Sequence, residues 1–182
     1  MQNFHTFLIA AISLDGFIAQ QLNQPSTAWT CQEDKKFFHK KTKQAGTIVL
    51  GKTTFETIGF PLPNRLNIVY TSSSAETLAK KYNFSTSQAS ADNFRTTALQ
   101  PAALVEQLAK EGKKQLAVCG GSSIYTQFMQ AGLVNKLFLT VEPVVFGQGI
   151  KLFNQPINQK LLLVSSKKLN QQGSLLLEYD CQ

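Results

Sequence analysis

Short apolar runs alternate with helix-forming segments along most of this chain, and this alternation limits the folds it can adopt. The runs are rich in β-branched residues, as buried parallel strands are, and the segments between them place apolar residues at helical spacing. We expect strands at residues 7–13, 47–50, 67–71, 94–97, 116–119 and 136–142, and helices at 33–43, 53–58, 75–82, 101–110 and 122–130. The runs at 160–168 and 174–180, separated by Asn-Gln-Gln-Gly, predict an antiparallel hairpin. The sequence therefore predicts a three-layer α/β fold with a mainly parallel central sheet and an antiparallel C-terminal hairpin.

Length and composition indicate a globular chain. A chain of 182 residues can bury a substantial core, and we expect a single domain over residues 1–182. Hydrophobic residues make up 43% and charged residues 16%, as in soluble proteins. Eighteen Lys and Arg against 11 Asp and Glu give a formal charge of +7. This balance suits anionic ligands, although nucleic acid binding or simple solubility would be equally compatible.

The cysteines and the N-terminal run bear on the cellular compartment. The three cysteines show no CxxC pair and no histidine cluster, so we expect no metal site and a reducing environment. The apolar run at 7–14 lacks a basic leader and continues into Asp15-Gly16, which favours a strand over a signal peptide. No run approaches the length of a membrane span. We expect a cytoplasmic protein with no membrane partner.

One strand-to-helix junction predicts an anion site. Gly51, Lys52, Thr53 and Thr54 follow the strand at 47–50, where a helix start offers free backbone N–H groups and the positive end of a dipole. The Pro-rich loop after this helix ends in Arg65, whose planar guanidinium suits a carboxylate or a phosphate. This segment therefore predicts anionic ligands.

A second junction of the same kind follows the strand at 116–119. Gly120-Gly121 lets the backbone approach a ligand closely, and Ser122-Ser123 can cap the next helix and donate to phosphate. Such turns are common in α/β proteins, so this one is weak evidence by itself.

Two acidic residues, Glu33 and Asp34, begin the helix at 33–43. Acidic residues are common in a first turn because they complement the helix dipole, so their presence alone does not indicate catalysis. The lysines of the same helix surround its outer face, which indicates a solvated surface and no nucleic acid partner. Residues 46–53 formally match a P-loop, but the four residues between the glycines are strand formers, so a nucleotide triphosphatase is not expected.

Residues 51–67 closely resemble the dihydrofolate reductases. The chain carries their Gly-basic-x-Thr-aromatic-Glu-x-Ile-Gly-x-Pro-Leu-Pro-x-Arg-x-Asn run, and Trp29, Asp34, Phe38 and Thr42 keep the spacing of the family's substrate helix. Residues 120–128 resemble the family's Gly-Gly-x-x-x-Tyr-x-Gln-Phe cofactor segment. The resemblance implies the family's fold, NADPH as cofactor and reduction of a pterin.

The same resemblance implies roles for individual residues. Asp34 would be the catalytic residue, promoting protonation of the pterin, and Arg65 would hold the glutamate carboxylate of folate. The substrate-binding residues implied are Ile9, Ala11, Phe38, Arg65 and Thr140. The cofactor-binding residues implied are Ala11, Ile18, Ala19, Gly51, Lys52, Thr53, Thr54, Ser72, Gly120, Gly121, Ser122, Ser123, Ile124 and Tyr125.

Other stretches resemble a different family of the same superfamily. The Phe146-Gly-x-Gly run and the run from Ser13 to Ala19 look like the reductase domain of the riboflavin-pathway deaminase-reductase. Ser123 stands where dihydrofolate reductases carry a basic residue, and the loop at 20–28 is longer than theirs.

The sequence therefore predicts an NADPH-dependent reductase of 7,8-dihydrofolate, acting as a monomer or homodimer on a small-molecule substrate. The alternative is a riboflavin-type reductase of an aminopyrimidine sugar phosphate or another pteridine. A non-catalytic binding protein on the same fold is the third possibility.

Overall fold

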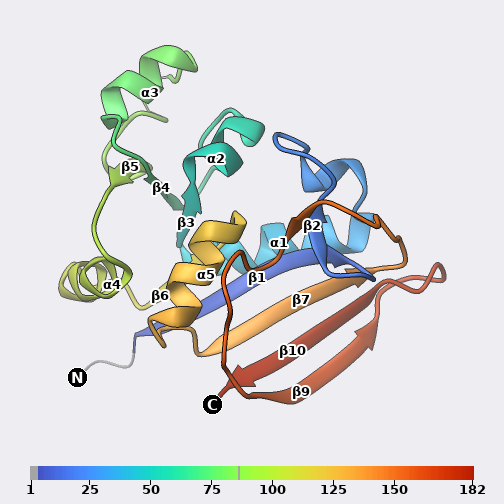
Figure 1. Ribbon diagram of the computed structural model, residues 1–182. Helices are drawn as coiled ribbons and strands as arrows, with labels where there is room; N and C mark the ends of the chain where they lie inside the picture. The colour runs from blue at the N-terminus through green and yellow to red at the C-terminus, as the bar shows by residue number, and fades with distance from the viewer. Residues whose placement is uncertain (1–3, 86) are drawn as a thin grey trace.

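Strands and helices alternate through most of the chain, and two antiparallel strands follow (Figure 1). The computed structural model describes residues 4–85 and 87–182. The strands are β1 His5–Ser13, β2 Phe17–Ala19, β3 Thr47–Gly51, β4 Leu66–Tyr70, β5 Phe94–Thr97, β6 Gln115–Val118, β7 Lys136–Glu142, β8 Ile150–Lys151, β9 Leu161–Lys168 and β10 Leu175–Cys181. The helices are α1 Gln32–Ala45, α2 Lys52–Ile58, α3 Ala75–Lys81, α4 Pro101–Lys110 and α5 Ser122–Gln130, with a 3-10 turn at Ser26–Ala28.

Eight strands form the central sheet in the order β5-β4-β3-β6-β1-β7-β10-β9. The pairs from β5 to β7 are parallel, whereas β10 runs antiparallel to both β7 and β9. The predicted fold class is therefore confirmed. Strand β6 lies between β3 and β1, so the turns that follow β3 and β6 lie side by side at the carboxyl ends of these strands.

Helices cover both faces of the sheet and bury two apolar cores. On one face, α4 and α5 pack on Leu8, Val49 and Leu116 through residues such as Leu108 and Phe128. On the other face, a second cluster joins α1, α2 and α3 to the alternate residues of the same strands, including Phe7, Ile9, Ile48, Leu50 and Val69. Successive strand residues point to opposite faces, which is why one apolar run can serve both cores.

Local capping explains where the helices begin and end. The hydroxyl of Ser74 accepts from the backbone N–H of Thr77, and Pro101 occupies the first turn of α4, both as the sequence predicts. Helices α1 and α2 end at Gly46 and Gly59, whose positive φ angles a residue with a Cβ would adopt only at a cost. The helices and strands that the sequence predicts all lie within two residues of those observed.

A small second sheet was not predicted. Strands β2 and β8 pair antiparallel and join the segment after β1 to the segment after β7. Strands of two or three residues are too short to show a period in sequence. Gly149 makes their close approach possible, because a Cβ at this position would lie 2.2 Å from the carbonyl oxygen of Ala19. In the part of the chain that the structure describes, none of the helices is both long and apolar enough to cross a bilayer.

Candidate active site

A cleft of about 1420 Å³ opens at the carboxyl ends of the central parallel strands. The last residues of β3 and β4 contribute to its wall, as does the turn after β6, and the first turns of α1, α2 and α5 converge on it. Ligands bind at this edge of parallel sheets because helix N-termini and strand ends meet there. Segments 18–27 and 149–156 complete the wall.

Most of the residues predicted for the site line this cleft. The apolar residues come from β1 and the segment that follows it, and Asp34 and Phe38 come from α1. The two glycine turns contribute the rest. The predicted residues found in the wall are Ile9, Ala11, Ile18, Ala19, Asp34, Phe38, Gly51, Lys52, Thr53, Thr54, Gly120, Gly121, Ser122, Ser123, Ile124 and Tyr125. The fold thus brings together residues more than a hundred positions apart in sequence.

Asp34 is the carboxylate of the cleft wall. It lies in the first turn of α1, where its backbone N–H donates to the sulfur of Cys31 at 3.4 Å. Burial raises the pKa of the Asp34 carboxyl, and the nearby charge of Glu142 raises it further, while the hydroxyls of Thr140 and Thr30 oppose the shift. A half-buried carboxyl of this kind takes up a proton more readily than an ordinary one. It is therefore suited to proton transfer.

Glu142 fixes the start of α1, and the sequence did not reveal this role. It is 3% exposed, and its carboxylate accepts from the backbone N–H of Cys31 at 2.8 Å and from the hydroxyl of Ser174. These bonds tie α1 to β7 and to the hairpin of β9 and β10. The sequence shows only an acidic residue at the end of an apolar strand. An acidic residue in such a position is more often solvated than buried.

The two glycine turns are built for a ligand that lies against the backbone. The N–H of Gly51 donates to the carbonyl of Gly120 at 2.7 Å, which holds the turns together. A Cβ at Gly121 would meet the hydroxyl oxygen of Thr54 at 3.0 Å, and the buried hydroxyl of Tyr125 donates to the carbonyl of Ile9 at 2.8 Å. The Ser122 hydroxyl is buried in this wall with no protein partner among the described residues.

These features fit the phosphates of a dinucleotide. An orphaned hydroxyl, a bare backbone at the start of α5 and the Lys52 ammonium at the start of α2 all offer donors to one stretch of the cleft. The predicted capping of α5 by Ser122 and Ser123 is wrong, however. Gly121 is the N-cap residue and makes no side-chain bond, so both serines already lie within the helix. Ser123 instead accepts from the side-chain amide of Gln127 at 3.1 Å.

Arg65 does not line the cleft, which corrects the role predicted for it. Its side chain is 3% exposed and donates to the hydroxyl of Thr42 and to the carbonyl of Pro63. Burial lowers the pKa of the guanidinium, and one of its terminal nitrogens has no partner among the described residues. The Pro-rich corner turns this residue toward α1 and away from the cleft.

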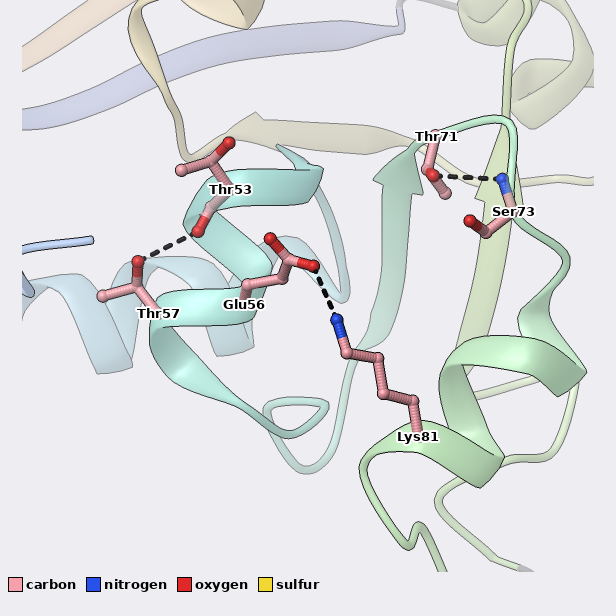
Figure 2. Close-up of polar contacts among 6 residues, drawn as sticks. All are labelled: Thr53, Glu56, Thr57, Thr71, Ser73 and Lys81. Atoms are coloured by element: carbon pink, nitrogen blue, oxygen red, sulfur yellow. Dashed lines mark hydrogen bonds and ion pairs between the residues drawn. The ribbon is translucent and has the colours of Figure 1, made fainter. Parts of the chain in front are cut away.

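Ser72 and Thr140 also lie outside the cleft wall. Ser72 is exposed because the chain turns back after β4, where the N–H of Ser73 donates to the hydroxyl of Thr71 (Figure 2). Thr140 is 1% exposed on β7, and its hydroxyl hydrogen-bonds the Asp34 carboxyl and opposes the rise in the pKa of Asp34.

Figure 2 also shows two contacts of α2, the helix that follows β3. Glu56 of α2 pairs with Lys81 of α3 at 3.1 Å, and the Thr57 hydroxyl donates to the backbone carbonyl of Thr53 at 2.9 Å. Both groups are partly solvated, so the ion pair adds little stability. It links the short helix that carries Lys52 to α3.

Several residues of the wall were missed in sequence. The segment from Gly149 to Pro156 closes one side, held to α5 by a 3.0 Å bond from the N–H of Asn154 to the Thr126 hydroxyl. Lys35 and Tyr70 also line the cleft. Burial raises the pKa of Tyr70 to about 12, and its hydroxyl has no partner among the described residues. Local sequence patterns carry no signal for such contacts between distant segments.

The three cysteines of the described chain are free, and within those residues no cluster of His, Cys, Asp and Glu could hold a metal ion.

The profile of the RibD C-terminal domain matches residues 5–175. The chain belongs to this family. The YyaP protein of Bacillus subtilis is 31% identical over 168 residues, which cover 84% of this chain and 83% of YyaP. The dihydrofolate reductase of Buchnera aphidicola is 29% identical over 141 residues, which cover 77% of this chain and 73% of that enzyme. The predicted superfamily is therefore confirmed.

Solved structures of other proteins share the fold. A pyrimidine reductase-like protein of Corynebacterium diphtheriae superposes with a TM-score of 0.73 at 16% identity, covering 100% of this chain and 93% of that one. The diaminohydroxyphosphoribosylaminopyrimidine deaminase/5-amino-6-(5-phosphoribosylamino)uracil reductase of Thermotoga maritima gives 0.75 at 13% identity, covering 99% of this chain and 57% of that one. At these identities the likeness concerns the fold alone.

Proposed function

We propose that this protein is an NADPH-dependent reductase whose substrate carries an aminopyrimidine ring. An aminopyrimidine sugar phosphate of the riboflavin pathway is the first candidate. The observation that carries the proposal is the Asp34 carboxylate in the wall of the cleft that also holds the two glycine turns. A carboxylate accepts two parallel hydrogen bonds, which a ring N–H and an adjacent amino group can donate together. Membership of a reductase family supports the same reading.

Lys52, Thr53, Thr54 and the turn Gly120–Ser123 would hold the cofactor's phosphates. The orphaned Ser122 hydroxyl and the crowded glycines support this placement. When bound, NADPH supplies a hydride to the substrate carbon. Ile18 and Ala19 of β2 give this part of the cleft an apolar wall, which excludes water from the reacting atoms.

The chain's own part in the reaction is to orient the ring and to manage a proton. Reduction of a C=N bond adds a hydride to carbon and a proton to the neighbouring nitrogen. Asp34, with its raised pKa, would promote that protonation, and Phe38, one helical turn further along α1, would pack against the ring. Both side chains come from one helix, whose start Glu142 fixes.

Dihydrofolate, the substrate predicted first, carries the same kind of ring and is the second candidate. The relation to dihydrofolate reductases favours it. The buried Arg65, however, removes the predicted partner of the folate glutamate. Lys35, beside Asp34 in the cleft wall, is better placed to meet a substrate phosphate. For this reason the aminopyrimidine sugar phosphate comes first.

The test is NADPH oxidation by the purified protein with three substrates: the aminopyrimidine ribosyl phosphate, its deaminated uracil counterpart and dihydrofolate. We expect both ribosyl phosphates to give a higher kcat/KM than dihydrofolate, because each combines adjacent ring N–H and amino donors with a phosphate. Asp34→Asn should lower kcat/KM by about 10²–10⁴-fold. Glu33→Gln, an exposed acid one residue earlier on α1, is the matched control and should leave it unchanged.

Turnover of dihydrofolate alone would establish the second candidate instead. Equal loss of activity in Glu33→Gln would contradict the assigned role of Asp34. Failure of NADPH to bind, measured by titration, would exclude a reductase and favour a binding protein.

A further inference from the structure

A buried acid at the end of β7 lies outside the cleft wall. Glu142 is 3% exposed, and burial of a carboxylate is costly unless a cation or hydrogen bonds replace the lost water. In the part of the chain that the structure describes, Glu142 forms no ion pair. Glu178 on the neighbouring strand β10, by contrast, pairs with Lys136 at 2.6 Å. The charge of Glu142 is therefore held in the interior by hydrogen bonds and is not neutralised.

These hydrogen bonds connect α1 to the tip of the C-terminal hairpin. The backbone N–H of Cys31, the N-cap residue of α1, donates to one carboxylate oxygen of Glu142 at 2.8 Å, and the hydroxyl of Ser174 donates to the other. Ser174 is 1% exposed and lies between β9 and β10, where the side-chain amide of Asn170 donates to its hydroxyl at 3.0 Å. Figure 1 shows this hairpin tip at the end of the sheet where β7 stops. A chain of hydrogen bonds thus runs from the hairpin to the start of α1.

The start of α1 also carries the acid of the cleft. The backbone N–H of Asp34 donates to the sulfur of Cys31 at 3.4 Å, so Cys31 makes a hydrogen bond with the backbone of one acid and with the side chain of the other. Burial is the main reason that the pKa of Asp34 is raised, and the charge of Glu142 adds to it. A like charge disfavours ionisation of its neighbour. The two carboxyl groups are therefore coupled.

The other titratable groups near Asp34 do not supply this effect. Lys35 is a cation and acts in the opposite direction. The thiol of Cys31 and the hydroxyl of Tyr125 stay neutral, because burial raises the pKa of each. Glu33 is exposed, so water screens its charge.

We propose that Glu142 is a positioning residue for Asp34, and that Ser174 and Asn170 of the hairpin hold it in that role. The Glu142 carboxylate secures the first turn of α1 through Cys31 and places a second negative charge near the acid of the cleft. Asp34 consequently stays protonated to higher pH, which favours transfer of a proton to the substrate. The inference rests on the proposed function for the use of that proton, whereas the effect of the charge can be measured without turnover.

The titration of the Asp34 carboxyl is that measurement. NMR of the full chain with isotope-labelled aspartate follows its carboxyl resonance across the acidic and neutral range, and Asp34→Asn identifies the signal by its absence. Glu142→Gln keeps the shape of the side chain, because an amide can accept from the N–H of Cys31 and donate to the hydroxyl of Ser174. It removes the charge. The Asp34 carboxyl should therefore titrate at lower pH in Glu142→Gln than in the wild type.

Ser174→Ala tests the hairpin end of the chain of bonds. It keeps the charge of Glu142 but removes the hydroxyl donor, so the carboxylate is held less firmly against α1. Asp34 should titrate at a pH between those of the wild type and Glu142→Gln. The kcat of NADPH oxidation should fall about 10-fold, because the first turn of α1 is less well positioned. The matched controls are Ser165→Ala, an exposed hydroxyl on β9, and Glu178→Gln, and both should leave the Asp34 titration unchanged.

An unchanged Asp34 titration in Glu142→Gln, with the circular dichroism spectrum of the wild type, would overturn the proposal, because Glu142 would then only anchor α1. An equal shift in Glu178→Gln would overturn it as well. If Glu142→Gln does not fold, Ser174→Ala decides by the same titration, and a wild-type curve in that variant refutes the proposal. The expected shifts in a protein that does not oxidise NADPH would support the effect of Glu142 on Asp34 and contradict the proposed function.

Discussion

The Asp34 carboxyl lines the candidate active site, and its ionised form lowers the free energy of unfolding. Its carboxyl is partly withdrawn from water and lies near the charge of Glu142, and both effects raise its pKa. The unfolded chain has neither effect. The folded chain therefore binds the Asp34 proton more tightly than the unfolded chain does, which makes the free energy of unfolding depend on pH.

This difference in proton affinity sets the sign of the pH dependence of the free energy of unfolding. As pH rises from the ordinary pKa of 3.8 through the raised folded value, the unfolded chain loses its proton first and the free energy of unfolding falls. Above that window the full cost of the ionised carboxylate is present. Asp34→Asn should therefore raise the Tm at neutral pH, on the order of a few degrees. The gain should vanish below pH 3.8, where both side chains are neutral.

Thermal melts of the two proteins across pH provide the measurement. A gain that persisted in acid would mean that the substitution acts through packing and not through charge. Glu33→Gln again serves as the control. Burial raises the free energy of the ionised form only at the half-buried Asp34, so the exposed neighbour should not reproduce the effect.

At the level of elements, the short strands β2 and β8 decide the shape of the cleft. The Asp15 carboxylate accepts from the Ser13 hydroxyl at 2.6 Å and from the N–H of Gly147 at 2.7 Å, which holds the two segments together. The Ser13 hydroxyl and these backbone groups lower the pKa of Asp15, so the bonds persist over most of the pH range. The approach is close enough that Gly149 has no room for a Cβ.

Gly149→Ala should therefore loosen this wall. The new Cβ would lie 2.2 Å from the Ala19 carbonyl oxygen at a φ of +152°, and we expect a loss of about 3 kcal/mol. Gly147→Ala is the matched control: its φ is +73° and its Cβ would meet nothing within 4 Å, so strain alone should cost about 1 kcal/mol. Urea unfolding of both variants measures the difference. Equal losses of unfolding free energy in the two variants would show that the contact with the Ala19 carbonyl does not affect stability.

At the scale of the whole molecule, one aromatic residue packs in the core and contributes to stability, whereas another lines the cleft. Phe55 is 1% exposed and packs against Tyr82, Phe84 and Phe94, which joins α2 to α3 and β5. Phe60, five residues later, is 50% exposed and lines the cleft. Phe55 belongs to α2 and Phe60 to the loop that follows it, so of these two neighbouring rings one packs in the core and the other lines the cleft.

Phe55→Ala should lower the free energy of unfolding by about 3–5 kcal/mol, because it empties a packed aromatic cluster. Phe60→Ala should change it by less than about 1 kcal/mol and act instead on the KM for the substrate. Chemical denaturation and steady-state kinetics separate the two effects. The assignment of Phe60 to the cleft would be wrong if its removal destabilised the fold and left the KM unaltered.

Most of the fold could be read from sequence because its elements are locally encoded. The apolar runs, the cap at Ser74 and the proline at 101 all act within a few residues of themselves. The same holds for the glycine turns and for Asp34, which lie next to elements with clear periods. Glu142 and Gly149 could not be assigned, because their partners Cys31 and Ala19 lie more than a hundred residues away.

The order of strands and helices, the two donor-rich turns and the acid at the start of α1 are encoded locally in the amino-acid sequence. Which of these groups meet depends on tertiary packing. Insertion of β6 between β3 and β1 places the turns at Gly51 and Gly120 side by side, whereas the corner before Arg65 turns that guanidinium into the interior. Local propensity fixes where an element begins and ends. The direction in which a side chain faces depends on packing against residues that are distant in the chain, and no local pattern records it.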